Sequence, residues 1–144
     1  MNRPVAYLAA LFAAWLSLST AMADDIVVFQ SAAIEDAYLT PAGTGGTSTL
    51  RMRITNEGFD NMTVLGVGGK SFQRSRIIAK LGDLEYAELD SISIPREESL
   101  DMTSMHLFVQ LNNMDKPVKT GDVVNLTLVL PYGELPFQAH VRAN

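Results

Sequence analysis

"TSTLRMRIT", residues 47–55, decides the fold class of this chain, because its side chains alternate between apolar and polar. In an extended strand Leu50, Met52 and Ile54 share one face, and Arg51 and Arg53 share the other. A helix would not place every second side chain on a common face. The stretch therefore predicts a strand with one buried face, which ends at the turn residues "NEGFDN".

The same period of two continues toward the C-terminus. Further predicted strand segments are "MTVLGVGG" (62–69), "FQRSRIIAKLGDLEYAELDSISIP" (72–95), "MHLFVQL" (105–111), "VVNLTLVL" (123–130) and "LPFQAHV" (135–141). The second of these holds two strands broken near Gly82, and Pro95 ends the latter. About seven or eight short strands without helices are typical of a β-sandwich or Greek-key barrel.

The N-terminal residues 1–23 have the pattern of a secretory signal peptide. Arg3 precedes an apolar run from Val5 to Leu18, and the small-residue triplet Ala21-Met22-Ala23 follows. The run is shorter than the roughly 20 residues of a membrane-spanning helix. We expect cleavage after Ala23, export of a soluble product, and one domain over residues 24–144 without a membrane span.

Composition excludes several classes of function. The chain carries a net charge of −5, which repels phosphate backbones and argues against a nucleic-acid partner. It has no cysteine, so disulfides, thiol chemistry and thiolate metal ligands are excluded. The two histidines lie in separate strands without a nucleophile-elbow motif, which argues against an enzyme. "GVGGKS" (66–71) lacks the spacing of a phosphate-binding loop and is interpreted as a turn.

"SLDMTSMHLFVQLNNM", residues 99–114, gathers three methionines and one histidine. Thioether and imidazole groups are ligands suited to Cu(I), whereas methionine also fills ordinary cores. Met105 is in phase with the apolar residues of its strand and is predicted to be core, as is Met52 on its own strand. Met114 is expected in a surface loop after the strand.

Met102 and His106 are the candidate metal ligands of this stretch. Met102 precedes the strand in a loop, from which its sulfur can swing toward His106. His106 lies opposite the apolar stripe, so it is either an exposed strand residue or a ligand. His140 is predicted to be a solvated residue of an edge strand.

The order of these segments resembles the periplasmic copper chaperone family PCu(A)C, a cupredoxin-like Greek-key β-sandwich. The resemblance covers most of residues 24–144. "TSTLRMRITNEGFDNMTVLGV" is similar to the early strand pair of that family, "SISIP" to its Ile-Pro element, "MHLFVQL" to its strand with a His-x-Met motif, and "KTGDVVNLTLVL" to its closing Gly-Asp strand.

The resemblance implies copper ligands at four positions: a histidine, a methionine further along, and the His-x-Met pair. His106 matches the histidine of the pair, and Phe108 stands at its methionine. Alignment on Ile94-Pro95 puts Tyr86 at the other methionine and Ser75 near the first histidine. Keeping the family's spacing from His106 instead gives Leu84 and Gln73, so neither register restores a ligand.

Two functional hypotheses follow from the resemblance. In the first, the protein binds Cu(I) through His106 and Met102 and delivers it to a copper-accepting respiratory oxidase subunit or another periplasmic protein. In the second, a metal-free member of the fold acts as a protein-interaction module, with Tyr86 and Phe108 forming an aromatic patch.

Overall fold

The computed structural model describes residues 31–104 and 106–143, and all regular elements in that part of the chain are strands. The all-β prediction is confirmed there. The strands are β1 (Ala32–Leu39), β2 (Ser48–Asn56), β3 (Met62–Val64), β4 (Gly66–Gly68), β5 (Phe72–Lys80), β6 (Tyr86–Leu89), β7 (Ile92–Ile94), β8 (Ser99–Asp101), β9 (Leu107–Met114), β10 (Val123–Leu130) and β11 (Gly133–Val141). The predicted signal peptide and Met105 lie outside the described residues.

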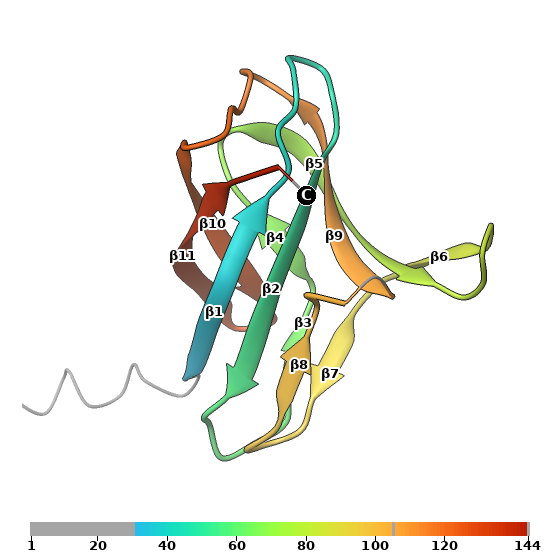
Figure 1. Ribbon diagram of the computed structural model, residues 1–144. Helices are drawn as coiled ribbons and strands as arrows, with labels where there is room; N and C mark the ends of the chain where they lie inside the picture. Colours follow the sequence, from blue (N-terminus) through green and yellow to red (C-terminus); the bar gives the residue numbers. More distant parts are fainter. Residues whose placement is uncertain (1–30, 105, 144) are drawn as a thin grey trace, which may run out of the picture. The chain divides into compact units, whose positions relative to one another are not determined.

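Nine strands form one mixed, curled sheet (Figure 1). Its order is β4-β10-β11-β1-β2-β9-β5-β6, and β8 pairs with β2 beside β9. The β1–β11 pair is parallel, and the other pairs of this sheet are antiparallel. β3 and β7 form a separate two-stranded sheet. The order leaves β4 and β6 at the two edges of the long sheet.

Strand β2 lies inside the long sheet, and buried and half-buried residues alternate along its whole length. Leu50, Met52 and Ile54 are fully buried, as the sequence predicts. The two buried polar residues at its ends have hydrogen-bond partners. Ser48 Oγ donates to the Thr40 carbonyl at 2.6 Å, and Asn56 Nδ2 donates to the Ile94 carbonyl at 2.9 Å. Satisfied polar groups let β2 run through the interior without a desolvation penalty.

The apolar faces of the long strands meet in one core. Inward residues of β10 and β11 alternate with exposed ones, as their sequence period predicts. The described part of the chain holds no apolar helix of membrane-spanning length. Packing of alternate side chains therefore supplies the core, in a chain without disulfides.

The structure corrects the predicted strand division in three places. Residues 62–69 hold two strands in different sheets, separated by Leu65, and β4 begins at Gly66 with φ +155°. The interpretation of 66–71 as a turn is wrong for Gly66–Gly68, which pair with β10. Residues 72–95 hold three strands, although the break near Gly82 is confirmed. Short strands such as β8 lack enough residues to show a period.

Met114 is also corrected: it is buried at the end of β9 instead of lying in a surface loop. The loop before β2 holds it there, because Gly45 N–H donates to the Met114 carbonyl and Met114 N–H donates to the Gly46 carbonyl. This long-range pairing is not visible in the local sequence.

Candidate functional site

The candidate site surrounds the loop that joins β8 to β9. Met102, its first residue, is fully buried in the core. Its N–H donates to the Met52 carbonyl at 2.8 Å, which continues the β2–β8 ladder by one residue. Residues opposite one another in such a ladder share a face, so the Met102 side chain joins Met52 inside. The predicted swing of Met102 toward His106 would therefore remove it from the core.

Asp101 fixes the start of this loop. One of its carboxylate oxygens accepts hydrogen bonds from the Thr103 hydroxyl and from Thr103 N–H, the latter at 2.8 Å. Its other oxygen accepts from Arg53 Nη2 at 3.2 Å. The Thr103 hydroxyl, its N–H and the Arg53 guanidinium together lower the pKa of Asp101 from 3.8 to about 2. The charged carboxylate thus anchors the loop to β2.

Arg51 holds the same loop on its outer side. Its Nη1 donates to the Met102 carbonyl at 3.4 Å and also to the Ser104 carbonyl. Its guanidinium carbon lies 5.3 Å from the centre of the Phe108 ring. The Phe108 ring in turn meets the Tyr86 ring edge to face, with centroids 6.4 Å apart and planes at 75°. The Arg51 guanidinium therefore contacts two loop carbonyls and the face of the Phe108 ring.

His106 is exposed in the turn that precedes β9. Its carbonyl accepts a hydrogen bond from Lys80 N–H at 2.8 Å, so the backbone at this point is tied to the end of β5. The imidazole is open to solvent. His140 is exposed as predicted, but β11 lies between β10 and β1, so it is not on an edge strand.

The positions aligned with copper ligands do not provide a soft donor set. Phe108 and Tyr86 form the aromatic pair, and Leu84 is 92% exposed at the tip of the β5–β6 hairpin. Ser75 Oγ accepts from Val67 N–H at 3.2 Å, which directs it toward β4. Among residues 31–104 and 106–143, no three His, Asp or Glu side chains gather as a metal-binding group. His106 is the remaining accessible member of the predicted set.

The β5–β6 hairpin beside His106 exposes apolar side chains. Figure 1 shows it extending away from the neighbouring strands. Leu81, Leu84 and Tyr86 are exposed along it, while Glu88 is held by Arg74 and Arg76 at 3.3 and 2.8 Å. These arginines lower the pKa of Glu88, with the Arg76 hydrogen bond as the largest cause. A fixed, apolar edge at this end of the sheet is suited to protein contact.

Arg51 is the feature that sequence reasoning missed. Alternation places it on the outer face of β2, but its partners come from residues more than fifty positions away. The only sequence signal was an arginine in a strand near the centre of the fold, facing a strand with an outward phenylalanine.

Comparison with solved structures identifies the fold. No protein-family model and no curated protein matches the sequence. The structure matches the copper-bound PCuAC domain from PmoF2 with a TM-score of 0.67 and 23% identity, over 78% of this chain and 93% of that one. The apo PCuAC domain from PmoF2 matches with a TM-score of 0.64 and 24% identity, over 79% of this chain and 94% of that one. The apo PCuAC domain from PmoF1 matches with a TM-score of 0.66 and 20% identity, over 78% of this chain and 94% of that one. The chain therefore has the cupredoxin-like fold of PCuAC domains.

Proposed function

We propose that this protein handles Cu(I) in the periplasm, with His106 as its metal ligand, and passes the ion to a copper-accepting partner such as a respiratory oxidase subunit. The observation that carries the proposal is an exposed imidazole before β9, on a fold shared with a copper-bound domain. Neutral imidazole binds copper, and an exposed ligand can exchange it with a partner.

A single imidazole binds copper weakly, which suits transfer more than storage. Met102 joins as a second ligand only if its side chain leaves the core. Exposure of a buried methionine costs about 1.5–3 kcal/mol, which lowers the affinity of a two-ligand site by roughly 10- to 150-fold. The ligand role of Met102 therefore stays a prediction that its own substitution must test.

The second candidate function is a metal-independent protein-interaction module. The Arg51 guanidinium favours it, because a fixed positive charge over the Phe108 ring opposes a metal cation at the same place. The apolar side chains of the β5–β6 hairpin supply the contact surface.

A Cu(I) titration of residues 24–144 against a competing chelator separates the two functions. The copper proposal expects one equivalent bound, lost in His106→Ala and kept in His140→Ala. His140 is a matched control because it is the other histidine of the chain and is also exposed. Absence of binding at micromolar copper, or equal loss in both variants, would refute copper handling at His106. Absence of copper binding would favour the protein-interaction module.

A further inference from the structure

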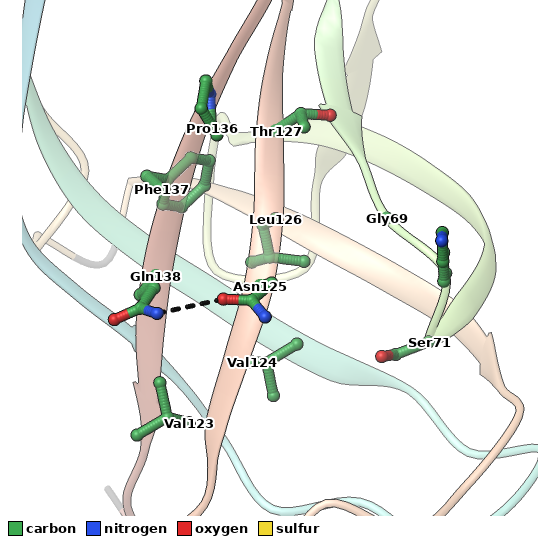
Figure 2. A pocket seen from close by; sticks show the side chains of 11 residues that line it. Gly69, Ser71, Val123, Val124, Asn125, Leu126, Thr127, Pro136, Phe137 and Gln138 are labelled. Atoms are coloured by element: carbon green, nitrogen blue, oxygen red, sulfur yellow. Dashed lines mark hydrogen bonds between the residues drawn. The ribbon is translucent and has the colours of Figure 1, made fainter.

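A groove lies along one edge of β10, apart in sequence from Met102, His106 and the other residues of the candidate site. It has a volume of about 670 Å³ and is lined by residues 69–71, 123–127 and 136–138. Figure 2 shows Val124 and Leu126 between the β10 ribbon and the turn that carries Gly69 and Ser71. Both of these β10 side chains are buried, so the floor of the groove is apolar.

The edge of β10 is open along this groove. β4 pairs with β10 only at Thr127–Val129, and no other described strand lies on that side of residues 123–126. The Val129 carbonyl accepts from Leu65 N–H and so points toward β4. Because backbone groups alternate sides along an antiparallel strand, the N–H and C=O groups of Asn125 and Val123 point the same way, into the groove.

Glycine sets the opposite wall. A Cβ on Gly69 would lie 2.8 Å from the Phe72 ring and 3.1 Å from Leu126, so the turn packs closely only because this residue is glycine. Across the strand, the Gln138 side-chain amide donates to Asn125 Oδ1 at 3.1 Å and fixes the rim (Figure 2). The close packing at Gly69 and the Gln138–Asn125 hydrogen bond therefore fix both sides of the groove.

Lys70 gives the groove its charge. It is the one charged side chain among the lining residues, and the ion pairs of the described residues do not include it. The Lys70 ammonium group favours a carboxylate over a cationic side chain at this point of the groove. A second copy would bring another Lys70 to the same edge, so like charges oppose self-pairing at this groove.

We infer that this groove binds an extended, acidic segment of a partner protein, which adds to β10 as a short strand. The open backbone groups of Val123 and Asn125 bind its main chain, Val124 and Leu126 contact an apolar side chain, and Lys70 pairs with an aspartate or glutamate. The inference does not depend on copper handling, and it is tested without metal.

The test uses a fluorescein-labelled heptapeptide of alternating valine and glutamate with residues 24–144, followed by fluorescence anisotropy. We expect saturable binding that Lys70→Glu weakens by about tenfold or more. Arg96→Glu makes the same charge change at an exposed turn and should leave the affinity unchanged. A valine–lysine peptide should bind Lys70→Glu better than the parent protein.

Amide hydrogen exchange tests the strand itself. The glutamate peptide should slow exchange at Asn125 at least tenfold and leave exchange at Leu89, on the far edge of the sheet, unchanged. No binding, equal loss in Lys70→Glu and Arg96→Glu, or binding without protection at Asn125 would each overturn the inference. Dimers of the peptide-free protein that disappear in Lys70→Glu would overturn it too, because a second copy would then occupy the groove.

Discussion

The Arg51 guanidinium lies over the Phe108 ring, with its carbon 5.3 Å from the ring centre, and donates to the loop carbonyls of Met102 and Ser104. The family resemblance implies a copper-binding methionine at the position of Phe108. Here the side chain at that position binds a cation from the protein itself. The permanently charged guanidinium holds the β8–β9 loop through these contacts.

Arg51→Ala should lower the free energy of unfolding by about 1–2 kcal/mol, because it removes a cation–π contact and charged hydrogen bonds. Urea unfolding followed by circular dichroism measures the change. Arg74→Ala is the control, since Arg74 makes an exposed ion pair with Glu88 and should cost less than about 1 kcal/mol. An equal cost in the two variants would show that Arg51 does not organise the loop.

Phe108→Met should raise the affinity for Cu(I) by about tenfold or more, because it places a thioether two residues from His106. The same chelator competition measures it. Phe108→Leu is the matched control: it removes the ring and its cation–π contact but adds no sulfur. A similar gain in Phe108→Leu would mean that loss of the ring, and not ligation, increased the affinity.

Arg51→Met in the Phe108→Met background should increase the affinity for Cu(I) further by removing a nearby positive charge.

Local sequence was sufficient for most of the long strands, but it missed β1, whose register shifts between Glu35 and Tyr38, and it was insufficient for the site. β2 follows from Leu50, Met52 and Ile54 because a period of two directly reports a half-buried strand. The Arg51–Phe108 contact depends on how β2 and the start of β9 approach one another, which no local pattern encodes. Phe108 itself is buried on the face predicted to be outward, because Arg51 and Tyr86 cover it.

Met102→Leu should change the free energy of unfolding by less than about 1.5 kcal/mol, because leucine keeps the buried volume that Met102 fills. It removes the sulfur. We expect the affinity for Cu(I) to stay within threefold of the parent value, since the thioether lies in the core. Met102→Ala should cost about 2–5 kcal/mol by opening a cavity, which identifies the packing role. A tenfold loss of copper affinity in the stable leucine variant would instead establish Met102 as a ligand.

Asp101 should make stability depend on pH below 4. Its pKa is lowered from 3.8 to about 2 in the folded protein, first by the Thr103 hydroxyl, then by Thr103 N–H and Arg53. A lowered pKa means that the folded state binds fewer protons than the unfolded state between these two values. The contribution of Asp101 to stability is therefore fully present above pH 3.8, decreases as the pH falls, and is lost near pH 2.

Urea midpoints measured from pH 5 to pH 2 should decline less steeply in Asp101→Asn than in the parent protein. Asp83→Asn, in the exposed tip of the β5–β6 hairpin, is the control and should retain the parent slope. Parallel curves for Asp101→Asn and the parent would show that the Thr103 and Arg53 contacts do not stabilise the charged carboxylate in solution.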